Sequence, residues 1–187
     1  MHADVGAFDR FARAYNLVMP RARVSKLEAG LAVADREIVR ALDVGGGPGR
    51  AVRRLDIPQR TVVDAAPGML EQARGYGLAT VAGDATRLPI RAASVDAVFI
   101  VDALHHIRDV ETVFAEAARV LRPGGVLVVR EFDPTTVRGW GLVAAERLVG
   151  FDSAFYTPAD LSTAMEDAGL EATVVERGFA YTVAGRR

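Results

Sequence analysis

The chain has 187 residues, which is the usual size of a single domain, and no internal repeat or linker divides it. Half of the residues are hydrophobic and a quarter are charged, as in soluble globular proteins. The formal net charge of -1 provides no basic field that would hold a polyanion, so we expect no nucleic acid partner.

The absence of cysteine excludes disulfides, thiolate metal sites and thiol nucleophiles. The three histidines are His2, His105 and His106. The two adjacent side chains are expected to point in different directions on a strand or a helix. We therefore predict no metal site.

No segment resembles a targeting signal or a membrane span. Residues 1–10 lack both a basic stretch and an apolar core. No uninterrupted apolar run approaches the ~20 residues that cross a bilayer. These features predict a cytoplasmic protein without stable membrane insertion.

The first 39 residues are predicted to form two amphipathic helices. Apolar residues recur at helical spacing over 7–19, up to Pro20, and again over 24–39. Tyr15 lies on the apolar stripe of the first helix, so it is either a core residue or a lid residue. We interpret 1–39 as a helical lid over a sheet edge.

Apolar runs alternate with helical patterns over 40–131. Strands are expected over 41–44, 61–63, 78–82, 95–101 and 126–130. A helix is expected from Gly49 to Leu55, and a longer one from Asp109 to Leu121 with Asp109 as its cap. This alternation predicts an α/β fold with a doubly wound parallel sheet and helices on both faces.

The rest of the chain is predicted to be an insertion over 132–156 and a terminal unit over 157–187. A helix is expected over 140–149. The aromatic residues of the insertion, which either line an acceptor pocket or pack internally, are Trp140, Phe151, Phe155 and Tyr156. The segment T-P-A-D starts a capped helix that ends at Gly169, and a strand hairpin follows.

The segment Ala41–Arg50 has the sequence A-L-D-V-G-G-G-P-G-R. Because glycine has no Cβ, it adopts positive φ and lets a ligand approach the backbone. At the carboxyl end of a parallel strand, such a turn predicts a nucleotide site. The dinucleotide pattern G-x-G-x-x-G needs a third glycine where Arg50 stands. The pattern D-x-G-x-G-x-G fits at Asp43, Gly45, Gly47 and Gly49.

Two further acids follow the next strand ends. Asp64 lies about 20 residues after the turn, where a carboxylate accepts both hydroxyls of a ribose. Asp84, in the segment G-D-A, is placed to accept from the exocyclic amine of an adenine. A capping or turn role is the alternative for both acids.

Together these segments resemble the class I S-adenosylmethionine-dependent methyltransferases. The resemblance rests on D-V-G-G-G-P-G-R, V-V-D-A-A-P-G-M-L, A-G-D-A-T-R-L-P, D-A-V-F-I-V-D-A-L-H-H-I and L-R-P-G-G-V-L-V-V, between Leu42 and Val129. The opening F-D-R-F-A-R-A-Y is similar to methyltransferases of the ubiquinone/menaquinone biosynthesis type. The family implies a Rossmann-like three-layer sandwich with a mostly parallel seven-stranded sheet and an antiparallel last strand. It also implies S-adenosylmethionine as cofactor and S-adenosylhomocysteine as product.

The resemblance further implies which residues contact the cofactor. Asp64 would hold the ribose hydroxyls, Asp84 would accept from the adenine amine, and Asp43 would reach the ammonium through water. The glycines would lie against the amino acid portion and the ribose of the cofactor. Val101 and Asp102 would close the site near the sulfonium. The implied set is Asp43, Gly45, Gly46, Gly47, Gly49, Asp64, Ala65, Met69, Asp84, Ala85, Val101 and Asp102.

Candidate catalytic residues follow from the chemistry. A sulfonium methyl is already activated, so the protein mainly aligns nucleophile, methyl carbon and sulfur, although some acceptors also need a proton removed. We consider His106, His105 and Tyr15 as candidate bases, with Glu131 and Tyr156 in segments expected to be mobile. The alternative is that one histidine is a surface residue at a helix start and the other packs against the cofactor.

The acceptor is narrowed by elimination. The segment D-A-L-H stands where amino-methylating relatives carry an Asn/Asp-Pro-Pro-aromatic motif, and arsenic-methylating relatives use cysteines, which this chain lacks. A small, apolar acceptor such as a quinone or an isoprenoid-type metabolite is our first expectation. An NAD-dependent oxidoreductase and a non-catalytic cofactor-binding partner protein remain alternatives. The sequence does not identify the acceptor atom that is methylated, and it does not decide whether the protein forms a homodimer.

Overall fold

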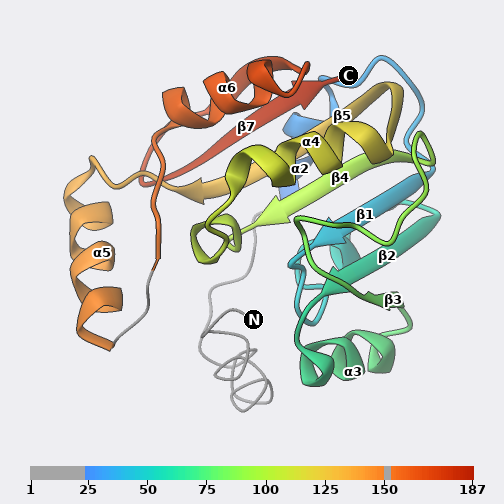
Figure 1. Cartoon of the computed structure of the whole chain (residues 1–187), viewed down its shortest axis with the longest axis horizontal. Helices are drawn as coiled ribbons and strands as arrows, with labels where there is room; N and C mark the ends of the chain where they lie inside the picture. Colours follow the sequence, from blue (N-terminus) through green and yellow to red (C-terminus); the bar gives the residue numbers. More distant parts are fainter. Residues whose placement is uncertain (1–23, 150–152) are drawn as a thin grey trace.

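The computed structural model describes residues 24–149 and 153–187 (Figure 1). Residues 1–23, which include the first expected helix and Tyr15, lie outside the described residues, as does Phe151. None of the helices in the described ranges is long and apolar enough to cross a membrane.

Seven strands form one sheet in the order β3-β2-β1-β4-β5-β7-β6. Only β7 runs antiparallel to its neighbours. The strands are β1 (Arg40–Val44), β2 (Gln59–Asp64), β3 (Ala79–Ala82), β4 (Val95–Val101), β5 (Leu121–Phe132), β6 (Glu171–Glu176) and β7 (Ala180–Arg186). This confirms the predicted fold class, including the antiparallel last strand.

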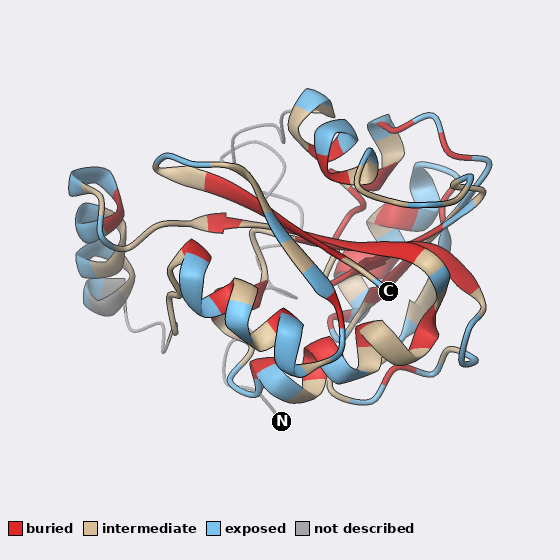
Figure 2. Cartoon of the chain, turned by 90° about the horizontal axis from the view of Figure 1, so that it is seen from above, coloured by how far each residue is buried: buried red, intermediate tan, exposed pale blue. Residues whose placement is uncertain are grey.

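Helices cover both faces of the sheet, and α5 extends beyond its edge (Figures 1 and 2). They are α2 (Val24–Leu31), α3 (Pro67–Gly75), α4 (Val110–Val120), α5 (Val137–Val149) and α6 (Pro158–Asp167), with short 3₁₀ helices η1 (Val52–Arg54) and η2 (Leu104–His106).

Alternation along the strands divides the core into two layers. In β5, Leu127 and Val129 pack with α4 and α6, whereas Val126 and Val128 pack with α2, η1 and α3. Every one of these four side chains is fully buried. Successive strand residues point to opposite faces, so a continuous apolar run supplies both layers of a parallel sheet.

The predicted lengths of two helices near the start of the described chain are wrong. The helix expected over 24–39 ends at Leu31, because the buried carboxylate of Asp96 holds the following segment. It accepts hydrogen bonds from the backbone of Val39 and Arg40 at 3.1 and 2.8 Å. It also forms an ion pair with Arg36 at 2.9 Å. These tertiary contacts outweigh the local helical pattern.

The helix expected from Gly49 to Leu55 is only the 3₁₀ helix η1. Gly49 has a φ of +72°, which no α-helical residue adopts, so the turn continues past it. An extended helix N-terminus therefore does not face the glycine turn.

The other expected helices are confirmed with small shifts. The Asp109 side chain accepts from the N–H of Thr112 at 3.0 Å and caps α4. Thr157 and Asp160 form a capping box at the start of α6. Such caps satisfy backbone groups that the first turn of a helix leaves unpaired.

Candidate active site

The glycine turn after β1 adopts a conformation that only glycine takes easily. Gly45, Gly47 and Gly49 have φ values of +64°, +53° and +72°. A Cβ on Gly49 would lie 2.1 Å from Cδ1 of Leu78, so this glycine lets the turn pack onto the protein body. Arg50, beside it, lines the pocket instead.

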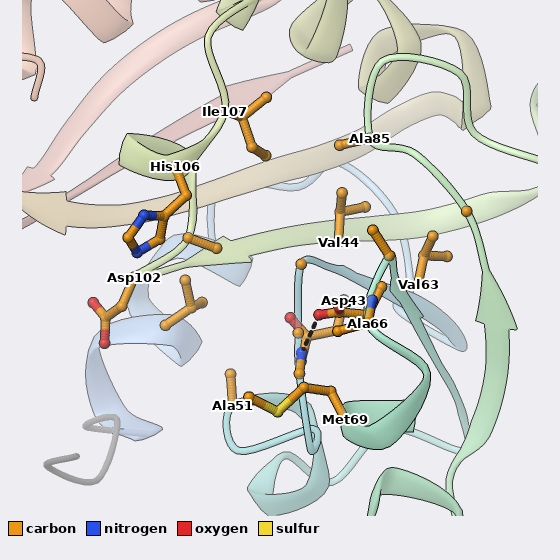
Figure 3. A pocket seen from close by; sticks show the side chains of 18 of the residues that line it. Asp43, Val44, Ala51, Val63, Ala66, Met69, Ala85, Asp102, His106 and Ile107 are labelled. Carbon is orange, nitrogen blue, oxygen red and sulfur yellow. Dashed lines mark hydrogen bonds between the residues drawn. The ribbon is translucent and has the colours of Figure 1, made fainter. Parts of the chain in front are cut away.

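A pocket opens over this turn, at the carboxyl ends of β1 and β4 where the strand order reverses (Figure 3). Ligands of doubly wound sheets bind at this kind of switch point. The pocket is lined by Asp43, Val44, Gly45, Gly46, Gly47, Arg50, Ala51, Val63, Asp64, Ala65, Ala66, Met69, Gly83, Asp84, Ala85, Val101, Asp102, Ala103, His106 and Ile107. The structure thus brings together every residue of the cofactor set expected from sequence except Gly49.

Asp43 lies fully buried at the floor of the pocket. Burial, together with the nearby charge of Asp64, raises the pKa of Asp43 to about 7, and the backbone N–H of Val52 offsets only part of this rise. Within the described residues, no hydrogen bond of good geometry reaches either carboxylate oxygen. A buried carboxylate of this kind is suited to a cationic group.

Asp64 fixes the local backbone at the end of β2. Its two oxygens accept from the N–H groups of Gly47 and Ala66, both at 2.8 Å. Burial raises the pKa of Asp64, and these backbone hydrogen bonds oppose the rise. Each carboxylate oxygen has a second lone pair, so this turn role leaves room for ribose hydroxyls.

Asp84 follows β3 and is exposed on the rim of the pocket. One of its oxygens accepts from the backbone N–H and the hydroxyl of Thr86, at 2.9 and 2.7 Å. This is an Asx-type turn, which aligns the loop that carries Ala85 along the pocket.

Asp102 is one of the few non-glycine residues with a positive φ, at +53°. Such backbone costs about 1 kcal/mol or more and clusters at functional sites. Its carboxylate forms an ion pair with Arg130 of β5. Burial raises the pKa of Asp102, and Arg130 opposes the rise.

His105 lies in a buried ion pair behind the pocket wall. Its Nδ1 is 2.8 Å from Oε2 of Glu131, whose other oxygen accepts from the N–H of Leu104 at 2.7 Å. Burial alone would lower the pKa of His105, but the charges of Glu131, Glu146 and Asp102 raise it above its usual value. Burial alone would raise the pKa of Glu131, but the charge of His105 and the hydrogen bond to it hold this pKa below its usual value.

His106 is the histidine that lines the pocket (Figure 3). Burial and the positive charge of His105 lower the pKa of His106 to about 3. The imidazole is therefore neutral at physiological pH, but it is a weak base.

Our expectation that the adjacent histidines point apart is wrong. Both lie on η2, and their ring centroids are 4.1 Å apart. The ring of Phe155 stacks on His105 at 5.1 Å and nearly parallel. Glu131 is also not in a mobile segment, because it lies in β5 and is buried.

The insertion contributes a side chain that we did not anticipate. Glu146 of α5 approaches His105, with 3.8 Å between Oε1 and Nε2. It is the only acidic residue in α5, which is the one signal that the sequence offered. Trp140 is 72% exposed and Tyr156 packs against the core, so neither lines the pocket.

Comparison with known proteins agrees with the geometry. A family model described as a methyltransferase domain matches residues 42–129. The chain is 35% identical to a demethylmenaquinone methyltransferase of Mycobacterium sp. (strain KMS), over 79% of this chain and 67% of that protein.

The chain belongs to the class I S-adenosylmethionine-dependent methyltransferases. A malonyl-[acyl-carrier protein] O-methyltransferase of Xylella fastidiosa (strain M23) is 38% identical over 70% of this methyltransferase, which spans about half, 48%, of that relative's length. A crystallised S-adenosylmethionine-dependent methyltransferase from Thermotoga maritima has the same fold, with a TM-score of 0.80 at 24% identity. That match covers 97% of this chain and 98% of the other. The cofactor of this family is S-adenosylmethionine.

Proposed function

We propose that the protein transfers a methyl group from S-adenosylmethionine to a small, largely apolar acceptor of the quinone or isoprenoid type. The observation that supports this proposal is the mostly apolar lining of the pocket at its end next to η2. Beyond Asp102, the lining residues there are Ala103, His106 and Ile107, so this end is mostly apolar. The similarity to enzymes named for demethylmenaquinone supports the same class of acceptor.

The residues of the glycine-turn side fit the cofactor. The buried carboxylate of Asp43 is suited to the ammonium group, directly or through water. Asp64 is held by two backbone N–H groups in an orientation that leaves lone pairs for ribose hydroxyls. Ala65 and Met69 are proposed to flank the adenine, with Asp84 accepting from its amine beside the backbone of Ala85.

The role of the protein in the reaction is chiefly alignment. When bound, S-adenosylmethionine supplies a methyl group that its sulfonium already activates. Asp102 and His106 lie at the η2 end of the pocket, beside the apolar side chains of Ala103 and Ile107. We assign them the positioning of the acceptor relative to the methyl group, a task worth several kcal/mol in bimolecular reactions.

The decisive experiment combines binding and turnover. Isothermal titration with S-adenosylmethionine, S-adenosylhomocysteine and NAD should detect the two sulfur compounds and not NAD. Methyl transfer from labelled cofactor is then measured to a reduced demethylmenaquinone analogue and to malonyl-acyl carrier protein. We expect labelled quinone product and no labelled carrier protein.

Other outcomes of that experiment separate the alternatives. Binding of NAD alone would favour the oxidoreductase. Binding of the sulfur compounds without transfer to any metabolite in an extract would favour a non-catalytic binding partner. Methylation of the carrier protein alone would show that the acceptor is the malonyl carboxylate and not a quinone.

A further inference from the structure

Three side chains with metal-binding atoms converge beside the pocket. One nitrogen from each of His105 and His106 and one carboxylate oxygen of Glu146 all lie within 4.8 Å of one another. The histidines come from η2 after β4, and the glutamate comes from α5 in the insertion. None of the three is exposed to solvent by more than an intermediate amount.

The environment of His105 is that of an oriented ligand. Its Nδ1 is held by Glu131 at 2.8 Å, which leaves Nε2 directed toward Glu146 at 3.8 Å. The rings of Phe155 and Phe132 enclose the imidazole, one stacked and one edge-on. Metal-bound histidines characteristically donate their second nitrogen to a carboxylate, which fixes the tautomer and the ring orientation.

Glu146 has a feature that its approach to His105 does not explain. Its Oε2 is buried and, among the described residues, has no hydrogen-bond partner. A distance of 3.8 Å from Oε1 to His105 is also longer than a hydrogen bond. A buried carboxylate oxygen of this kind costs about 1–3 kcal/mol when unpaired, so a ligand that accepts its lone pair is favoured.

The charge around the cluster is also suited to a cation. Glu131 is paired with His105 and Asp102 with Arg130, so Glu146 is the carboxylate with an oxygen to which no described group donates a hydrogen bond. Carboxylates in a partly desolvated site need a compensating positive charge.

We propose that His105, His106 and Glu146 bind a divalent transition-metal ion such as zinc. Two imidazoles and one carboxylate, with a fourth position left for water or substrate, suit zinc, whereas magnesium and manganese prefer oxygen ligands. Ligand atoms on one tetrahedral ion stand roughly 3.3 Å apart, so the three ligand atoms would have to move about 1 Å closer together on binding.

Of the three ligands only His106 lines the pocket, so the ion would face the pocket beside His106, at the η2 end. There it would coordinate an oxygen of the acceptor, such as a quinol hydroxyl, and orient it toward the methyl group. The metal site depends only on the three side chains, whereas this role in acceptor binding rests on the proposed function.

The test is metal binding by the whole protein, without an added affinity tag and without cofactor. The protein is treated with chelator, exchanged into metal-free buffer and titrated calorimetrically with ZnCl₂, MnCl₂ and MgCl₂. We expect one zinc ion per chain, weaker binding of manganese and no binding of magnesium. Metal content after dialysis gives an independent stoichiometry.

Matched variants locate the ion. Glu146→Gln keeps the size and polarity of the side chain and should weaken zinc binding more than 100-fold. Glu131→Gln, which changes the residue behind His105, should weaken it by about 10- to 100-fold. Glu166→Gln, an exposed glutamate on α6, is the control and should bind zinc as the parent protein does. Circular dichroism melts verify that each variant is folded.

The results separate this inference from the proposed function. Zinc binding that is unchanged in Glu146→Gln would be adventitious and would overturn the site, as would no binding in the parent protein. Methyl transfer at an undiminished rate in chelator-treated, metal-free protein would overturn the role in acceptor binding alone. Zinc binding that Glu146→Gln abolishes, in a protein that binds no S-adenosylmethionine, would support the site while refuting the proposed function.

Discussion

The two ends of the pocket are built in different ways. On the glycine-turn side, Asp43, Asp64 and Asp84 each stand at or just after the end of a strand, and backbone N–H groups hold the last two. At the η2 end, His105 meets Glu131 and Glu146, which are 26 and 41 positions away along the chain. The first arrangement follows from local turns, whereas the second depends on tertiary packing.

This difference has energetic consequences. The carboxylate of Asp43, at the floor of the glycine-turn side, is fully buried, and among the described residues no ion pair or hydrogen bond of good geometry reaches it, so its ionised form destabilises the fold and is suited to a cationic ligand. The buried carboxylate at the η2 end is paired with an imidazole and a backbone N–H, so its removal leaves a buried group unpaired. Substitutions at the two ends should therefore change stability in opposite directions.

The largest effect is expected at the η2 end. Glu131→Ala removes the partner of His105 and the acceptor of the Leu104 N–H. Breaking a buried ion pair in this way costs about 3 to 5 kcal/mol of unfolding free energy. Urea unfolding, followed by circular dichroism, measures it. The exposed Glu166→Ala is the control, and equal midpoints for the two variants would contradict the paired state of Glu131.

The next effect has the opposite sign and depends on pH. The folded pKa of Asp43 is raised to about 7 from 3.8. Its contribution to stability is thus full below pH 3.8 and is lost as pH rises through 7. Asp43→Asn should raise the unfolding free energy by about 2 to 4 kcal/mol at pH 8.5, and by clearly less at pH 5.

Two controls define the Asp43 result. Asp56→Asn, at an exposed aspartate, should leave the unfolding free energy unchanged at both pH values. In the parent protein, S-adenosylmethionine should bind more tightly as pH rises through 7, because its ammonium favours the ionised carboxylate. Asp43→Asn should lose that pH dependence in calorimetric titration. A stabilisation of equal size at pH 5 and pH 8.5 would rule out the raised pKa.

The glycine-turn side was predictable because its determinants are local. The apolar runs, the glycines and the acids at strand ends lie within short segments, and the strand order follows from general connection rules. Two helix lengths were nevertheless predicted wrongly, because Asp96 holds the backbone at the start of β1 and because Gly49 takes a positive φ.

The η2 end could not be predicted in the same way. The sequence around His105 does not predict that Glu131 and Glu146 lie beside it, because the fold places β5 and α5 next to η2. Even the direction of the His105 and His106 rings depends on η2, a 3₁₀ turn that neither a strand nor an α-helix pattern anticipates. Side chains that converge across long sequence separations require the folded structure.

The smallest effect that sharpens the comparison is at Gly46. Its φ does not exclude alanine, but a Cβ there would lie 2.4 Å from Cγ of Asp43. Gly46→Ala therefore has to displace the Asp43 carboxylate, and we expect S-adenosylmethionine to bind about 10-fold more weakly, or ~1.4 kcal/mol. Gly75→Ala is the matched control, since a Cβ at Gly75 meets no atom within 4 Å. If both variants bind the cofactor as the parent does, the carboxylate beneath the turn takes no part in binding, and the glycine is needed only for the turn.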